Sequence, residues 1–167
     1  MKKYMIKTKR LGLRLLEKND IKYLEKLESD PEVKKYFING PSTREQAKAR
    51  MSDFISYYED KGLPCFVMFE LESNEFIGRC GFVPAKTGEI IVGYLLHKKF
   101  WGNGYASEAL IALLEWSKQN IDADYIIAFA LADNTASQRV MQKCGMEHYK
   151  DDTTKGVACS FYRANNQ

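Results

Sequence analysis

The chain has 167 residues, of which 45% are hydrophobic and 28% are charged, and its formal net charge is +3. This length and composition are typical of a globular protein, and we expect a single domain over residues 1–167. The charge is too small to indicate nucleic-acid binding, no apolar run approaches the roughly 18 residues of a membrane span, and residues 1–9 lack the apolar core of a signal peptide.

The first third of the chain predicts a strand followed by three helices. In residues 11–15 leucine alternates with small or polar residues, which is typical of a strand. A short helix with one apolar face follows over about 20–28, and Pro31 opens another over about 31–37. A longer helix extends over about 43–61, because its apolar residues recur with the helical period.

The rest of the chain predicts a meander of strands and then an alternation of helices and strands. Three strands over 65–71, 75–83 and 89–96 are joined by turns short enough for antiparallel hairpins. A helix follows from about residue 105, and the apolar run 125–131 is typical of a strand buried on both faces.

Near the end, Asn134 caps a helix that Gly145 stops, and residues 146–151 and 157–163 form a last pair of strands. The order of elements predicts an α/β or α+β domain with a mixed sheet. Its one strand–helix–strand step has a glycine-rich loop where the first of its two strands passes to the helix.

That loop lies in the segment FWGNGYASEAL (100–110), which sets Gly102 and Gly104 before the helix. A glycine-rich turn leaves backbone N–H groups unpaired at the positive end of a helix, which makes a site for phosphate. A side chain at either glycine would block the anion, Ala106 is small for the same reason, and Ser107 adds a hydroxyl. The alternative is that the glycines only form a turn and that Ala106 packs the helix onto the sheet.

Two other phosphate loops do not match. The chain has no Walker A pattern, G-x-x-x-x-G-K-[ST]. A dinucleotide fingerprint would need a third glycine where Ser107 stands, and it would not have residues 97–101 between the strand and the glycines. A Rossmann-type nucleotide enzyme is therefore a disfavoured alternative.

The segment GYLLHKKFWGNGYASEAL (93–110) resembles the cofactor loop of the GNAT superfamily of N-acetyltransferases, in particular the branch of ribosomal-protein N-terminal acetyltransferases. The family loop reads Gln/Arg-x-x-Gly-x-Gly/Ala, and Trp101 stands here at its first position. Four more segments resemble the same branch in the same order, so that the resemblance covers nearly the whole chain: TKRLGLRLLEKNDIKYL, SDPEVKKYF, FIGRCGFV and ADNTASQRVMQKCGM.

The resemblance implies a GNAT-like fold, in which helices flank a mixed, mostly antiparallel central sheet that splays between two parallel strands. The splayed strands would be 89–96 and 125–131, and coenzyme A would fill the wedge between them. It also implies transfer of the acetyl group of acetyl-CoA, as a cosubstrate, to a primary amine by direct transfer in a ternary complex. The amine would belong to a protein N-terminus, an amino acid or a small amine.

The resemblance further implies which residues bind acetyl-CoA. Backbone amides of the glycine loop would bind the pyrophosphate, the end of the strand 89–96 would pair with the pantetheine arm, and the Leu95 N–H would polarise the thioester carbonyl. For Asn134 helix capping is the alternative, and both roles can hold through different atoms. The full implied set is Tyr94, Leu95, Leu96, Gly102, Asn103, Gly104, Tyr105, Ala106, Ser107 and Asn134.

The catalytic residues depart from the family pattern. A carboxylate base is common in this branch two residues before the strand glycine, Gly93, where this chain has Ile91. Glu89, on the same face of the strand, is the predicted base, with a hairpin-edge charge as the alternative. Met141 replaces the tyrosine that protonates the thiolate, so Ser137 is predicted to bond the sulfur. These departures leave open a catalytically degenerate acyl-CoA-binding protein.

The sequence does not identify the amine that accepts the acetyl group. In this fold the part of the site that binds the acceptor is built mainly from the first two helices, about residues 20–60, which carry both signs of charge and several aromatic residues. We expect a small-molecule or peptide amine as partner, no nucleic acid, no membrane, and a monomer or homodimer. The four cysteines form neither a Cys-x-x-Cys pair nor a Cys/His cluster, so we expect no metal and a cytoplasmic protein.

Overall fold

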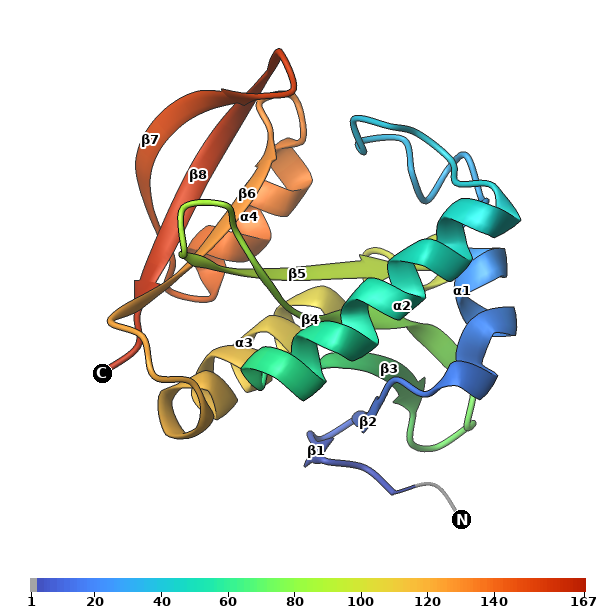
Figure 1. The fold of residues 1–167 in the computed structure, drawn as a ribbon. Coiled ribbons are helices and arrows are strands. Elements are labelled where there is room, and N and C mark those ends of the chain that lie inside the picture. Colours follow the sequence, from blue (N-terminus) through green and yellow to red (C-terminus); the bar gives the residue numbers. More distant parts are fainter. Residues whose placement is uncertain (1–2) are drawn as a thin grey trace.

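A sheet of eight strands runs through the computed structural model, which describes residues 3–167 (Figure 1). The strands lie in the order β1-β2-β3-β4-β5-β6-β8-β7, and every neighbouring pair is antiparallel except β5 and β6. The predicted mixed, mostly antiparallel sheet is confirmed. The strands are β1 (Ile6–Lys7), β2 (Leu11–Leu15), β3 (Cys65–Glu70), β4 (Phe76–Pro84), β5 (Ile90–Leu96), β6 (Tyr125–Leu131), β7 (Glu147–Thr154) and β8 (Val157–Asn165).

Helices cover both faces of this sheet, with α1 and α2 on one face and α3 and α4 on the other (Figure 1). No helix among residues 3–167 is both long enough and apolar enough to cross a membrane. The α-helices are α1 (Ile21–Glu28), α2 (Arg44–Lys61), α3 (Tyr105–Asn120) and α4 (Thr135–Lys143), and the 3₁₀ helices are η1 (Lys18–Asp20) and η2 (Lys98–Phe100).

The two faces of the sheet hold separate apolar cores. Phe66 of β3 belongs to the cluster that includes Leu110 of α3, whereas its neighbour Val67 belongs to the cluster that includes Phe54 of α2. Successive side chains of a strand point to opposite faces, so an almost wholly apolar β3 is the expected sequence of a strand covered on both sides.

The long helix α2 begins and ends where the sequence predicts. The Thr43 hydroxyl accepts a hydrogen bond from the Gln46 N–H (3.2 Å), and the Gln46 side chain accepts one from the Thr43 N–H (2.9 Å), which closes a capping box. At the other end Gly62 has a φ of 69°, a left-handed conformation that terminates helices and that favours glycine.

The prediction of a short helix over 31–37 is wrong, because residues 31–36 form turns. Isolated hydrogen bonds hold them, such as the one from the Lys34 N–H to the Asp30 C=O (3.0 Å). A helix of this length does not repay the cost of its nucleation. Burial of the Val33 and Lys34 side chains fixes the segment instead.

The parallel strands β5 and β6 diverge soon after they begin. In the described part of the chain they pair only at Ile91 and Ile127, whereas β5 pairs with β4 along its whole length, from Ile90 to Leu96. Figure 1 shows β6 turning away from β5. The C-terminal half of β5 therefore presents an open edge toward β6, and the predicted splay is confirmed.

Candidate functional site

The loop between β5 and α3 presents free backbone amides at a helix N-terminus. Gly102 and Gly104 have φ angles of 76° and 81°, and Gly104 is the N-cap of α3. Among residues 3–167 the N–H groups of 102–107 find no acceptor, and the first bond into the helix runs from the Glu108 N–H to the Gly104 C=O (3.0 Å). Such a row of amides at the positive end of a helix can bind an anion.

The surroundings of the two glycines leave room for a ligand. Among the described residues, a Cβ atom on Gly102 would meet nothing within 4 Å, and one on Gly104 would meet only the Nη2 of Arg10, at 3.4 Å. Packing within the protein therefore does not demand glycine at either position. The positive φ angles require glycine for the turn itself, and the open surface above the turn leaves room for an anion to approach.

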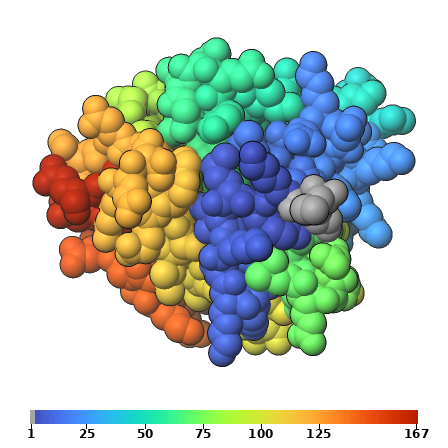
Figure 2. Space-filling model, turned by 90° about the horizontal axis from the view of Figure 1, so that it is seen from below, coloured from blue at the N-terminus to red at the C-terminus, as the bar shows by residue number. Residues whose placement is uncertain are grey.

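Arg10 fixes this loop from the N-terminal segment, although no sequence pattern indicated it. Its Nη1 donates to the Asn103 C=O (2.8 Å), its Nε donates to the Glu108 carboxylate (2.7 Å), and its guanidinium lies 4.1 Å from the centroid of the Tyr105 ring. Figure 2 shows the N-terminal segment (blue) lying beside α3 (gold). Asn103 and Glu108 lie 93 and 98 residues away from Arg10 in the sequence, so only the fold brings them together.

Glu108 is the anionic partner of Arg10 at the start of α3. Burial raises the pKa of the Glu108 carboxyl, but hydrogen bonds from the Thr8 hydroxyl and from Arg10 outweigh this effect and lower it. The carboxylate is therefore held ionised. It stabilises the first turn of α3 and ties the N-terminal segment to the glycine loop.

The open edge of β5 carries the amides of alternate residues. The His97 N–H donates to the Ile77 C=O of β4 (2.9 Å). Because the backbone groups of a strand alternate in direction, the Leu95 N–H also points to β4, and those of Tyr94 and Leu96 point toward β6. Contrary to the expectation, the Leu95 amide therefore belongs to the antiparallel ladder, and the Tyr94 and Leu96 amides lie on the open edge.

Trp101 holds the glycine loop against the end of β5. Its indole N–H donates to the Leu96 C=O (3.0 Å), and the Asn103 side-chain amide donates to the Trp101 C=O (3.1 Å). The open edge of β5 and the free amides of 102–107 are thus neighbouring parts of one continuous stretch of chain.

Tyr94 and Ser137 bridge β5 and α4. The Tyr94 hydroxyl lies 2.9 Å from the Ser137 Oγ. Burial raises the pKa of Tyr94 to about 12, so that its phenol stays protonated at neutral pH. Met141, at the position of the expected tyrosine, is buried in the core and 3% exposed. A phenol from β5 therefore reaches the α4 region, where the family pattern places a tyrosine of the helix.

Asn134 caps α4, as its sequence position predicts. Its Oδ1 accepts a hydrogen bond from the Ser137 N–H (3.2 Å). Its Nδ2 donates no hydrogen bond within residues 3–167, so the cap leaves that group available for another partner.

Glu89 stands at the closed end of the splay. Its carboxylate accepts hydrogen bonds from the Thr87 hydroxyl (2.8 Å) and the Tyr125 hydroxyl (2.9 Å). The strands β5 and β6 pair at Ile91 and Ile127. Glu89 lies two residues before Ile91, and Tyr125 lies two residues before Ile127. The hydrogen bond to Glu89 raises the pKa of Tyr125. Glu89 is thus both a hairpin charge and a carboxylate beside the start of the wedge.

A cavity of about 360 Å³ opens on the α2 side of the sheet near this point. Its walls are α2, the loop that holds Asn39 and Ser42, and the end of β4. Val83, on the β4 wall, pairs with Ile91 of β5, so this wall of the cavity lies one strand away from the point where the splay begins. Its volume falls in the range of small-molecule sites. The segment predicted to form the acceptor side, about 20–60, supplies most of its walls.

Comparison with known proteins places the chain among acetyltransferases. The model of the acetyltransferase (GNAT) domain matches residues 10–147. An uncharacterized N-acetyltransferase of Bacillus licheniformis is 33% identical over 146 residues, which are 84% of this chain and 80% of that protein.

Solved structures share the fold along nearly the whole chain. A GNAT-family acetyltransferase from Bacillus anthracis matches with a TM-score of 0.80 and 26% identity, over 96% of this chain and 98% of that one. A spermidine N-acetyltransferase from Vibrio cholerae, in complex with CoA and spermine, matches with a TM-score of 0.78 and 14% identity, over 95% of this chain and 97% of that one. An identity of 14% shows the shared fold alone.

Proposed function

The chain belongs to the acetyltransferase (GNAT) family, and from that premise we propose that it moves the acetyl group of acetyl-CoA to the primary amine of a small molecule or peptide, by direct transfer in a ternary complex. The observation that carries the proposal is the row of free amides at 102–107, directly beyond the open edge of β5. The mostly antiparallel sheet does not favour the Rossmann alternative, whose sheet is parallel.

The residues present fit acetyl-CoA in two ways. The amides of 102–107, at the positive end of α3, suit its pyrophosphate, and the Ser107 hydroxyl adds a further donor. The Tyr94 and Leu96 amides on the open edge of β5 suit the amide groups of its pantetheine arm. The spermidine N-acetyltransferase that shares this fold was solved with CoA bound, which supports the same use here.

The chemistry asks little of side chains, because a thioester is already activated toward amines. The protein has to align the two reactants, polarise the carbonyl, accept a proton from the amine and stabilise the departing thiolate. We assign the polarising donor to an N–H group on the open edge of β5, either Tyr94 or Leu96. A fixed backbone donor gives this stabilisation without having to reorganise during the reaction.

We assign the stabilisation of the thiolate to the Ser137 hydroxyl, supported by Tyr94. With its pKa raised to about 12, the Tyr94 phenol stays protonated at neutral pH, so it can donate a hydrogen bond to the Ser137 Oγ and orient it. Ser137→Ala is expected to lower kcat roughly tenfold or more, the loss of one hydrogen bond to a charged group, with little change in melting temperature. Tyr94→Phe is expected to lower kcat less.

Asn134→Ala provides the matched comparison for steady-state kinetics and thermal unfolding. Loss of the α4 cap should reduce the free energy of unfolding by about 1 kcal/mol. If the Asn134 side-chain amide also binds the cofactor, the KM for acetyl-CoA should rise. A Ser137→Ala variant that loses stability and keeps the parent kcat would assign Ser137 to structure alone.

We assign the proton acceptor to Glu89, acting directly or through water. Glu89→Gln is expected to lower kcat/KM about 10²-fold and to leave acetyl-CoA affinity unchanged, because the amide keeps the shape and removes the basic oxygen. Thr87→Ala, which removes the two hairpin hydrogen bonds between Thr87 and Glu89 and keeps the carboxylate, is the control. Parent-like kinetics for Glu89→Gln, with a pH–rate profile that follows the amine alone, would show that the proton passes to bulk water.

Thermal unfolding with added ligands tests the proposed function. A ligand that binds only the folded state stabilises it by about 2.7 kcal/mol at a hundredfold excess over its Kd. We expect acetyl-CoA to raise the melting temperature, and NADH and ATP not to do so. No shift with millimolar acetyl-CoA would contradict the proposal. Binding without acetyl transfer to any amine would favour the degenerate acyl-CoA-binding alternative.

A further inference from the structure

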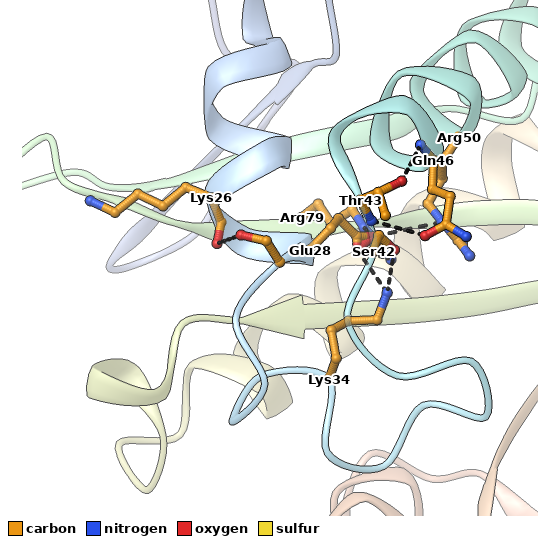
Figure 3. Close-up of polar contacts among 9 residues, drawn as sticks. Lys26, Glu28, Lys34, Ser42, Thr43, Gln46, Arg50 and Arg79 are labelled. Atoms are coloured by element: carbon orange, nitrogen blue, oxygen red, sulfur yellow. Dashed lines mark hydrogen bonds and ion pairs between the residues drawn. The ribbon is translucent and has the colours of Figure 1, made fainter.

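A buried cluster of charges stands behind the cavity next to α2. Glu28, at the end of α1, is 0% exposed, and Lys34 is 2% exposed. The Glu28 carboxylate accepts from Arg79 of β4 (2.7 Å) and from Lys34 (3.3 Å), and Lys34 also donates to the Ser42 hydroxyl on the cavity wall (3.3 Å). Figure 3 shows Glu28 between Arg79 and Lys34.

Arg50 is the third cation of this cluster, and in the described part of the chain it has no hydrogen-bond acceptor. Its Nε lies 3.8 Å from the Glu28 Oε1, beyond hydrogen-bond distance, and that oxygen already accepts two bonds from Arg79. The guanidinium has five N–H donors, and none of them donates a hydrogen bond within residues 3–167. The Arg50 side chain is 38% exposed and lines the cavity. Its free donors therefore face the open space.

The charges around the cavity do not balance. The cationic side chains are Lys34, Arg50 and Arg79, and the carboxylates are Glu28 and Asp53. Three cations against two carboxylates leave a surplus of one positive charge. Asp53 lies one helical turn beyond Arg50 on the same wall, and it forms no ion pair in the described part of the chain. Burial, followed by the charge of Arg79, lowers the pKa of Arg50, as expected for a cation short of partners.

This arrangement selects among amines. A polyamine would bring further positive charge next to a cluster that already has a surplus of it. An amine that also carries an oxyanion would satisfy Arg50, whose planar fork of donors matches such groups. Its ammonium group, before it loses a proton, would be matched by Asp53. The cavity of about 360 Å³ suits a ligand of this size.

Resting on the proposed acetyl transfer, we propose that the acceptor is a small zwitterionic amine whose oxyanion, a carboxylate or a phosphate-type group, binds to the Arg50 guanidinium in the cavity between α2, the 39–42 loop and the end of β4. An α-amino acid is the simplest member of this class. Val83 on the β4 wall pairs with β5 where the splay begins, so a ligand in the cavity lies one strand away from the start of the wedge that is proposed to hold acetyl-CoA.

The test compares matched acceptors at saturating acetyl-CoA. A panel of L-amino acids identifies the best acceptor, which is then compared with its carboxamide, its aminophosphonate analogue, spermidine and a short peptide blocked at its C-terminus. We expect kcat/KM for the oxyanion-bearing acceptors to exceed that of the carboxamide roughly 10- to 100-fold, the range for one charge-assisted contact. The ratio of kcat/KM for the carboxylate acceptor to kcat/KM for the phosphonate acceptor shows which of the two oxyanions the site prefers.

Substitutions on helix α2 test whether Arg50 is the residue that recognises the oxyanion. Arg50→Gln should raise the KM for the oxyanion-bearing acceptor and remove its advantage over the carboxamide, and Arg50→Lys should restore part of it. Arg44→Gln, also on α2 but in an exposed ion pair with Glu25, is the control and should keep the preference. Calorimetry of the same acceptors with the CoA-saturated protein measures binding without requiring chemistry.

Two outcomes would overturn this inference alone: intact acetyl-CoA binding together with equal use of carboxamide and carboxylate, or a preference for spermidine or the blocked peptide. An Arg50→Gln variant that keeps the parent preference would also overturn it. Binding of acetyl-CoA to the parent protein is measured first. If the parent does not bind acetyl-CoA, the proposed function and this inference are overturned together.

Discussion

Gly104→Val is expected to weaken acetyl-CoA binding about hundredfold or more while the chain remains folded. The residue has a φ of 81° and caps α3 in the middle of the free amides at 102–107. A branched side chain resists this conformation and covers the surface through which a pyrophosphate would approach. Loss of two hydrogen bonds to a charged group costs about 3 kcal/mol or more, which is about a hundredfold in affinity. Calorimetric titration with acetyl-CoA measures it.

The control for this variant separates backbone strain from loss of the site. Gly156, in the β7–β8 hairpin, has nearly the same φ, 80°, and no atom of residues 3–167 lies within 4 Å of an added Cβ. Gly156→Val should therefore suffer similar strain, of order 1–3 kcal/mol, and keep its affinity for acetyl-CoA. If folded Gly104→Val binds acetyl-CoA as tightly as the parent, the pyrophosphate does not lie on this loop.

Glu28→Gln is expected to produce the largest loss of stability among the changes considered. The carboxylate is fully buried and faces Arg79, Lys34 and Arg50. Removing one partner from a buried ionic cluster leaves the other charges uncompensated, which costs about 3–5 kcal/mol. For a chain of this length the melting temperature should fall by roughly 10 °C. Glu25→Gln, on the same helix but in an exposed pair with Arg44, should cost at most about 1 kcal/mol.

The effect of Glu28→Gln should also depend on pH in a defined direction. Burial raises the pKa of Glu28, but the charges of Arg79 and Lys34 outweigh it and hold the pKa below the usual 4.5. A lowered folded-state pKa gives stability that is complete above 4.5 and is lost as the pH falls through the folded value. The gap between parent and variant should therefore narrow in acid. A constant gap from neutral pH downward would mean that Glu28 is not ionised in the folded protein.

Local patterns in the sequence predict most of the elements, because each expresses a local rule. The apolar period of α2, its Thr43 cap and its Gly62 terminus all act within a few residues, and they fix that helix. The pair of glycines before α3 predicts an anion site for the same reason. The segment at 31–36 escapes such rules, because Lys34 is held by a buried partner on α1 and not by helical hydrogen bonds.

The site depends on contacts that no local pattern contains. Arg10 reaches Asn103 across 93 residues, and Arg79 reaches Glu28 across 51. The direction of the Leu95 amide depends on the register of β5 against β4, which follows from pairing and not from composition. The resemblance to the family predicted the wedge and its strands, but the cavity beside Arg50 emerges only when α2 and β4 are placed together.

Simultaneous measurement of free CoA thiol and acetylated amine tests the central claim most directly. Purified protein is mixed with acetyl-CoA and a panel of amino acids, polyamines and peptides, the thiol is followed with a chromogenic reagent, and the products are identified by mass spectrometry. The account predicts that at least one amine is acetylated, with one thiol released for each acetyl group transferred. Thiol release without an acetylated amine, or no turnover across the whole panel, would contradict it.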